Sequence, residues 1–270
     1  MAFQSTFPFE PNAGLADALA VLRALPVREG HWDEMRDASG VLREPWRRFF
    51  ELLGEDGIAD LDQDAASIAR QIRDNDISYN VYADNGESRP RSLDLLPFLI
   101  DEAEWTGIER GVKQRAHLLN AIVADVYGQQ TLLQRGLLPP ALVFGHPGYL
   151  RAVKDYVPPG GQYLRLVAID LARAPHGRWT VMAYRTEAPF GLGYALENRM
   201  IVASLFTDPF RTMRVSRLAA SFSQLVATLA QLARATMRGA RDEAPPIALS
   251  HPGRIAKPTS STRSSRVILA

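Results

Sequence analysis

The sequence contains no cysteine, which excludes disulfides, thiolate metal sites and cysteine nucleophiles. It also lacks an excess of either charge, because 31 basic and 30 acidic residues leave a net charge of +1. Nucleic acid and anionic membranes are therefore not expected partners. No apolar run approaches the roughly 18 residues of a spanning helix, and the first residues do not form a secretory signal. These absences predict a cytoplasmic protein.

Several signatures of nucleotide binding and hydrolysis are also missing. There is no G-x-x-x-x-G-K-[ST] loop, no H-E-x-x-H pair and no G-x-S-x-G elbow. Gly191 and Gly193 begin a dinucleotide-binding fingerprint that lacks its third glycine. Asp101, Glu102 and Glu104 are clustered, but they open a predicted helix, where the helix dipole favours acidic side chains. P-loop, zincin, serine-hydrolase and Rossmann chemistry are therefore unsupported.

Helical patterns dominate the first part of the chain, residues 1–75. Residues 16–25 are apolar at helical spacing and stop at Pro26, and Pro45 stands where a second helix can begin. Trp46, Phe49 and Phe50 then fall on one side of that helix. We interpret this part as a helical N-terminal segment that provides a scaffold rather than chemistry.

The middle of the chain adds a short strand and a long helix. Residues 77–84, ISYNVYAD, alternate as a strand does, and Asn85-Gly86 marks a tight turn. Residues 101–127 carry apolar side chains at three- and four-residue steps, which predicts a helix that packs against a core.

A β-hairpin is predicted next. Its strands span residues 162–172 and 179–184, and the turn-forming stretch RAPHGR separates them. Ile169 and Leu171 share one face, whereas Asp170 lies on the other. A carboxylate on a mostly apolar face is costly unless it is paired, hydrogen-bonded or bound to a metal.

Glycine introduces the last ordered part of the chain. Gly191 and Gly193 precede a predicted helix through Glu197, Arg199 and Phe206, an arrangement that can present backbone donors to phosphate. Residues 216–237 predict another amphipathic helix. Residues 250–270 are rich in Ser, Thr, Arg and Pro without periodicity, and we expect a disordered or non-native tail left by a frameshift or truncation.

Three sequence blocks together resemble one known family. They are Tyr79-Asn80-Val81-Tyr82 with Asp84-Asn85-Gly86, then WTGIERGVKQRAHLLNAIVADVY from Trp105, then AYRTEAPFGLGYALENR from Ala183. Over residues 76–232 they are similar to the circularly permuted ATP-grasp family of type 2. The resemblance implies an α+β fold in which an antiparallel hairpin is packed by helices, with residues 76–249 as the N-terminal part of the ATP-grasp domain.

The same resemblance implies an ATP-dependent carboxylate–amine ligase that works through an acyl phosphate. ATP and Mg²⁺ are the implied cofactors, and an amino acid or peptide-like molecule is the implied substrate. Proteins with alpha-E or transglutaminase-like domains are implied partners.

The metal site is the first place where the resemblance assigns residues. It implies that Asp170 faces a magnesium ion, although Asp170 can equally cap the turn or pair with Arg173 or Arg178. Typical members place Glu-x-Asn at the end of the second strand, where this chain has Ala183 and Arg185. Neither residue is a magnesium ligand, so Arg185 is interpreted as a catalytic contact to phosphate or carboxylate, or else as an exposed strand-end residue.

Further residues are assigned to ligand binding by the resemblance. Asn80 and Tyr82 are expected to line the cleft, although a strand tyrosine is often a core residue. The other expected ligand-binding residues are Gly191, Gly193, Glu197, Asn198 and Arg199. Glu197 and Arg199 can instead anchor their helix through buried ion pairs.

Two functional hypotheses follow. In the first, the chain is part of an ATP-grasp ligase, incomplete and inactive alone. In the second, it is a non-catalytic pseudoenzyme module that binds a ligand or a partner. The absent Glu-x-Asn pair and the absence of family sequence after Leu249 favour the second.

Overall fold

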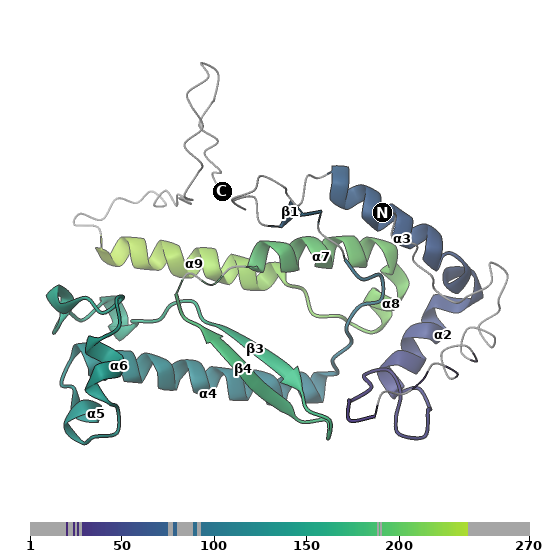
Figure 1. The fold of residues 1–270 in the computed structure, drawn as a ribbon. Coiled ribbons are helices and arrows are strands. Elements are labelled where there is room, and N and C mark those ends of the chain that lie inside the picture. The colour runs from purple at the N-terminus through teal and green to yellow at the C-terminus, as the bar shows by residue number, and fades with distance from the viewer. Residues whose placement is uncertain are drawn as a thin grey trace, which may run out of the picture. The chain divides into compact units, whose positions relative to one another are not determined.

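The computed structural model describes residues 20, 24, 26, 29–74, 78–79, 89–90, 93–187, 189 and 191–236. Figure 1 shows the helices and strands along the chain, which divides into two compact units. The first unit combines Met1–Leu22, Phe49–Pro97 and Tyr194–Ala270, and the second combines Arg23–Arg48 and Phe98–Gly193. Each unit is therefore built from stretches that are distant in sequence.

The first unit is mainly helical. It contains most of α2 (Glu44–Ala59) and α7 (Leu192–Leu205), together with α3 (Leu61–Asp74), α8 (Thr207–Thr212) and α9 (Ala219–Thr236). Two short strands, β1 (Ser78–Tyr79) and β2 (Arg89–Pro90), pair antiparallel. The buried apolar side chains of this unit include Phe49, Phe50, Ile58, Leu61, Ile68, Ile72, Leu95, Ile201 and Phe206.

Aromatic packing joins the N-terminal helices to the C-terminal ones in this unit. Phe49 contacts Phe50 and Phe206 edge to face, with ring centroids 5.6 Å and 5.2 Å apart. Phe49, Phe50 and Phe206 are each 2% exposed. The helix expected to begin near Pro45 is found as Glu44–Ala59, and Phe49 and Phe50, which were expected on one of its sides, are both buried.

The second unit is organised around α4 (Glu102–Tyr127). Asp101 caps this helix, since its carboxylate accepts a hydrogen bond from the backbone N–H of Glu104 at 2.7 Å. Asp125, near the other end, accepts from the N–H groups of Thr131 and Leu132. It thereby caps α5 (Thr131–Gln134), which precedes α6 (Pro140–Phe144), η1 (Arg151–Val153) and η2 (Pro159–Gly161).

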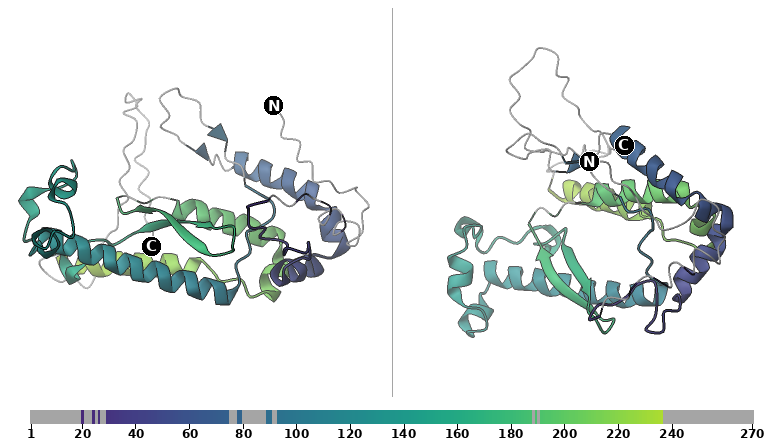
Figure 2. Two further views of the ribbon diagram at one scale, coloured as in Figure 1. Left: turned by 60° about the horizontal axis from the view of Figure 1, so that its bottom comes forward. Right: turned by 45° about the vertical axis from the view of Figure 1, so that its right-hand side comes forward.

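The hairpin of β3 (Ala168–Arg173) and β4 (Trp179–Arg185) lies along α4 (Figure 2). A lone two-stranded hairpin is marginal in water, so this packing stabilises it. The register pairs Arg173 with Trp179 and Leu171 with Val181, but Asp170 with Ala183. One residue of β4 therefore bulges out of the ladder, and every residue beyond it changes face.

The first strand of the hairpin is shorter than the predicted range of 162–172. Asn120 of α4 accounts for the first part of the difference, because its Oδ1 accepts hydrogen bonds from the N–H groups of Tyr163 and Leu164, at 2.9 and 3.0 Å. These donors are therefore committed to α4 and not to a strand partner. Ladder pairing begins only at Ala168.

Most other predicted elements are found with shifted ends. The helix expected over 101–127 spans Glu102–Tyr127, and the helix expected over 216–237 spans Ala219–Thr236. Of the strand expected over 77–84, Ser78 and Tyr79 are described and form β1. Residues 250–270 lie outside the described residues. Among the helices that are described, none has the length and apolarity needed to cross a membrane.

Candidate functional site

Asp170 and Arg185 form an ion pair at the open end of the hairpin. Nε and Nη2 of Arg185 donate to Oδ2 of Asp170, at 3.0 and 2.8 Å. The side chains of Asp170 and Arg185 are 42% and 53% exposed. The hydrogen bond and the charge of Asp170 raise the pKa of Arg185. The partner of Asp170 is thus Arg185, and not Arg173 or Arg178.

The bulge in β4 creates this pairing. Val181 lies opposite Leu171 on the face toward α4, and strict alternation would place residues 183 and 185 on that same face. The register shift instead sets Ala183 opposite Asp170 and Arg185 opposite Ala168. Cross-strand partners share a face, so Arg185 joins Asp170 on the face turned away from α4.

Gly191 and Gly193 stand at the start of α7. Gly191 has φ of 109°, a conformation that side-chain-bearing residues rarely adopt. Gly193 is the second residue of the helix, and a Cβ built on it would meet nothing within 4 Å. The turn therefore requires glycine at position 191, whereas no described contact requires it at position 193.

Glu197, Asn198 and Arg199 lie together on α7 and are each partly buried. Nη1 of Arg199 donates to the backbone oxygen of Ser216 at 3.1 Å, and its guanidinium lies 5.4 Å from the ring centroid of Phe210. Burial lowers the pKa of Arg199. Oδ1 of Asn198 is buried and accepts no hydrogen bond from the described residues. Asn80 and Tyr82 lie outside the described residues.

A second arginine, at the turn end of the hairpin, anchors a cluster that the sequence does not predict. Arg173 donates from Nε and Nη2 to the two carboxylate oxygens of Glu34, at 3.0 and 2.9 Å, and it also pairs with Glu104. Its side chain is only 10% exposed. The hydrogen bonds that Arg173 donates to Glu104 and Glu34 raise its pKa above the usual value. Glu34 and Arg173 are 139 positions apart, so no local pattern could have revealed this pair.

Aromatic rings enclose the same guanidinium. Arg173 lies 4.2 Å from the ring centroid of Trp179 and 5.5 Å from that of Trp32. Arg43 covers Trp32 at 4.0 Å. The indole N–H of Trp179 donates to Glu104 at 3.1 Å. The alternation of cations and rings fixes the segment around Trp32 against the hairpin turn and the start of α4.

The family model for circularly permuted ATP-grasp type 2 proteins matches residues 97–258, which include α4, the whole hairpin and α7. The chain belongs to the circularly permuted ATP-grasp type 2 family. The predicted resemblance is confirmed, and so is the α+β class with a partial ATP-grasp fold.

Curated relatives of this ATP-grasp chain occur in several bacteria. An uncharacterized protein of Mycobacterium tuberculosis is 36% identical over 214 residues, covering 74% of this chain and 24% of that protein. A second uncharacterized Mycobacterium tuberculosis protein is 34% identical over 184 residues, covering 68% of this chain and 33% of its own length. An uncharacterized protein of Synechocystis is 35% identical over 158 residues, covering 58% of this chain and 33% of that protein. The chain thus spans about a quarter to a third of the length of these relatives.

The residues around Asp170 do not fit the magnesium ion that the ATP-grasp family implies. A guanidinium occupies one oxygen of the carboxylate, and its positive charge opposes a second cation there. The cross-strand neighbour is Ala183, which has no ligand atom. Within the described ranges, no group of three or more His, Asp or Glu residues could hold a metal ion. This arrangement disfavours a magnesium ion at Asp170, and the role of Asp170 as a metal ligand stays a prediction.

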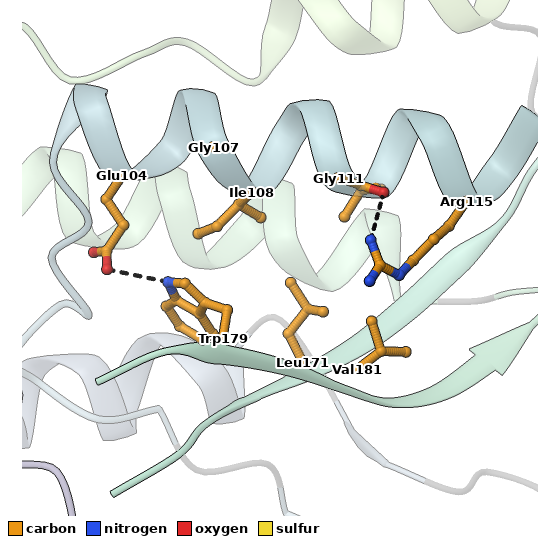
Figure 3. Close-up of a pocket in the computed structure, with 9 residues that line it drawn as sticks. Glu104, Gly107, Ile108, Gly111, Arg115, Leu171, Trp179 and Val181 are labelled. Atoms are coloured by element: carbon orange, nitrogen blue, oxygen red, sulfur yellow. Dashed lines mark hydrogen bonds between the residues drawn. The ribbon is translucent and has the colours of Figure 1, made fainter. Parts of the chain in front are cut away.

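A cavity of about 200 Å³ separates the hairpin from α4 in this ATP-grasp chain (Figure 3). Its lining consists of Glu104, Gly107, Ile108, Gly111, Val112, Arg115, Leu171, Trp179 and Val181. In Figure 3 the side chains of Leu171 and Val181 point from the strands toward the glycine-containing side of α4. Arg115 folds back and donates to the backbone oxygen of Gly111 at 3.0 Å. The cavity is thus apolar in its middle, with charged side chains at its two ends.

Proposed function

We propose that this chain supplies part of the site of an ATP-dependent ligase that joins a carboxylate to an amine. The observation that supports this proposal most strongly is the match of residues 97–258 to the circularly permuted ATP-grasp type 2 family. We further propose an amino acid or a peptide-like molecule as the substrate.

The proposed reaction has two steps. A carboxylate oxygen of the substrate attacks the γ-phosphorus of ATP, the bond to the bridging oxygen breaks, and ADP leaves from the acyl phosphate. The nitrogen of the amine then attacks the acyl carbon, the bond from that carbon to the phosphate oxygen breaks, and phosphate and one proton are released. Both steps require positive groups near phosphate and carboxylate oxygens.

Arg185 is the residue of the hairpin that we propose for this role. It carries a planar array of N–H donors at the end of a strand and is half exposed. Gly191, just before α7, has a positive φ, and Asn198 on α7 has a buried oxygen to which no described residue donates. We propose that Gly191, Gly193, Glu197, Asn198 and Arg199 contribute to ligand binding.

We assign no step of the proposed reaction to Mg²⁺. The family implies Mg²⁺ as well as ATP, but the pairing of Asp170 with Arg185 does not supply its ligands. The alpha-E and transglutaminase-like partners likewise stay predictions.

The test is a chimera in which this chain is followed by the part of the second Mycobacterium tuberculosis relative that lies beyond the matched 184 residues. We expect ADP release that depends on an amino-acid or peptide mixture, measured by chromatography. Arg185→Gln should reduce the rate about a hundredfold, the usual size of losing one charge-stabilising group. Arg178→Gln is the matched control, because Arg178 is also an exposed arginine of the hairpin. Equal rates for the two variants would contradict the role of Arg185.

A non-catalytic binding module is the second candidate. The pairing of Arg185 with the carboxylate that was expected to hold a metal favours it. This candidate predicts that the chimera binds ATP or a peptide in calorimetry without releasing ADP.

A further inference from the structure

Arg185, at the open end of the hairpin, has N–H donors that its pairing with Asp170 does not use. A guanidinium carries five N–H groups. Asp170 receives a hydrogen bond from Nε and one from Nη2, both to the single oxygen Oδ2. Because 53% of the Arg185 side chain is exposed, its remaining donors can be reached from solvent.

The neighbours of the ion pair leave room for an incoming group. The cross-strand partner of Asp170 is Ala183, and that of Arg185 is Ala168. Alanine side chains beside the pair are short, so they do not screen the guanidinium. The bulge in β4 keeps Arg185 on this face, and bulges recur where a strand must redirect a functional side chain.

We propose that Asp170 and Arg185 form a masked oxyanion site, in which Arg185 binds a phosphate or carboxylate group and Asp170 holds the guanidinium until the anion displaces it. Asp170 is thus an internal substitute for the ligand, since a carboxylate is one of the anions that the planar guanidinium recognises. This inference rests on the proposed function, whose reaction contains both kinds of anion.

An oxyanion site and a metal site predict opposite effects of Asp170→Asn on ligand binding. If Asp170 is a metal ligand, Asp170→Asn weakens binding of anything held through the metal. If Asp170 competes with the ligand for Arg185, the same substitution strengthens anion binding in the absence of any metal. An exposed pair is weak enough to be displaced, so we expect the gain to be about two- to fivefold in Kd.

The experiment is a titration of the full chain with inorganic phosphate, and separately with acetate, in the presence of EDTA. The readout is the Nε–Hε signal of Arg185 in a ¹H–¹⁵N spectrum, assigned by its loss in Arg185→Gln. We expect phosphate or acetate to shift this signal in the wild type and at lower concentration in Asp170→Asn. A response to phosphate alone assigns a phosphoryl group, and a response to acetate alone assigns a carboxylate.

A second exposed ion pair provides the control. Asp208 and Arg211 of α8 are 3.0 Å apart, with side chains 73% and 78% exposed. Asp208→Asn should leave the titration unchanged. Circular dichroism confirms that each variant is folded, which is expected because both pairs are exposed.

Three results would overturn the inference. They are no shift of the Arg185 signal at any anion concentration, an unchanged or weaker response in Asp170→Asn, and Mg²⁺ binding that Asp170→Asn abolishes. These results are separate from the fate of the proposed function. If the chimera is inactive but the anion titration gives the expected shifts, the ligase is rejected and the oxyanion site is kept. If the chimera is active but the titration gives no such shifts, the oxyanion site is rejected and the ligase is kept.

Discussion

Two arginines stand at opposite ends of one hairpin and differ in almost every physical respect. Arg173, at the turn, is 10% exposed, is held by Glu34 and Glu104 and lies beside the rings of Trp32 and Trp179. Arg185, at the open end, is 53% exposed and pairs with one carboxylate among the described residues, that of Asp170. A buried ion pair needs every partner, whereas an exposed pair can exchange one anion for another.

The contrast separates a positioning residue from a binding residue. Arg173 joins the segment around Trp32, the start of α4 and the hairpin turn, so it fixes the ribbon that carries Arg185. Arg185 keeps donors in solvent. Charge and residue type alone do not distinguish the two, but burial and the number of partners do.

The largest expected effect follows from removing the buried cation. Arg173→Met leaves Glu34 and Glu104 without their partner, and we expect the free energy of unfolding to fall by about 3 kcal/mol, the lower end for a broken buried pair because both carboxylates keep some exposure. Urea denaturation followed by circular dichroism measures it.

Arg185→Met is the matched comparison at the other end of the hairpin. It should leave the urea midpoint almost unchanged, since an exposed pair contributes little to folding. Similar midpoint shifts in both variants would show that the two ends of the hairpin do not differ as described.

Gly177 provides the next largest effect. It turns the hairpin with φ of 83°, and a Cβ built on it would lie 2.5 Å from the ring of Trp32. Gly177→Ala should therefore lower the free energy of unfolding by about 2 kcal/mol, the sum of backbone strain and displacement of the ring.

Gly136 isolates the first of these two contributions, the backbone strain. Its φ is 68°, but a Cβ there would meet nothing within 4 Å. Gly136→Ala should show the strain alone and thus the smaller loss. Thermal and urea denaturation measure both losses. If Gly177→Ala and Gly136→Ala lowered the free energy of unfolding equally, Trp32 would not pack on the turn.

Local patterns in the sequence predict the helices and strands but not the long-range contacts and irregularities that connect them. Periodicity locates α4 to within one residue, because its caps and apolar stripe are encoded locally. It cannot predict that Asn120 captures the N–H groups of Tyr163 and Leu164, which shortens β3. It also cannot predict the bulge, which moves Arg185 to the face of Asp170.

The contacts of the buried Arg173 could not be predicted from the sequence. Its partners come from residues before the hairpin by 69 and 139 positions, and only the folded chain brings them together. Exposed Arg185 was singled out by resemblance to the family. Asn80 and Tyr82 were chosen in the same way, and they stay predictions because they lie outside the described residues.

The pH dependence of stability sharpens the comparison at the turn end. Asp33 lies beside Trp32 and Glu34. Burial alone would raise its pKa, but hydrogen bonds from the backbone and side chain of Arg36 and from the N–H of Met35 outweigh it and lower the pKa below 3.8. A lowered pKa in the folded state stabilises the fold above the unfolded pKa, and this stability is lost as the pH falls through the folded value.

Asp33→Asn therefore should lower the free energy of unfolding by about 1 kcal/mol at neutral pH and by progressively less below pH about 4. Urea midpoints between pH 7 and pH 3 measure it. A difference from the wild type that stays constant over this range would show that the charge of Asp33 is not what holds the segment.

Gly107 gives the smallest effect, and it is the one expected to stabilise. It lies in the interior of α4, facing the cavity between the helix and the hairpin, and a Cβ there would meet nothing within 4 Å. Alanine costs a helix interior less than glycine, so Gly107→Ala should raise the free energy of unfolding by about 0.5 to 1 kcal/mol.

Gly111 is the control for this substitution, because a Cβ there would lie 3.3 Å from Nη1 of Arg115 and the gain should be smaller. The change at position 107 lies on α4, away from the open end of the hairpin, so the phosphate titration of Arg185 should not move. A stabilised chain with an altered titration would mean that the cavity and the open end are coupled, and the hairpin would then act as one unit rather than as a fixed end and a binding end.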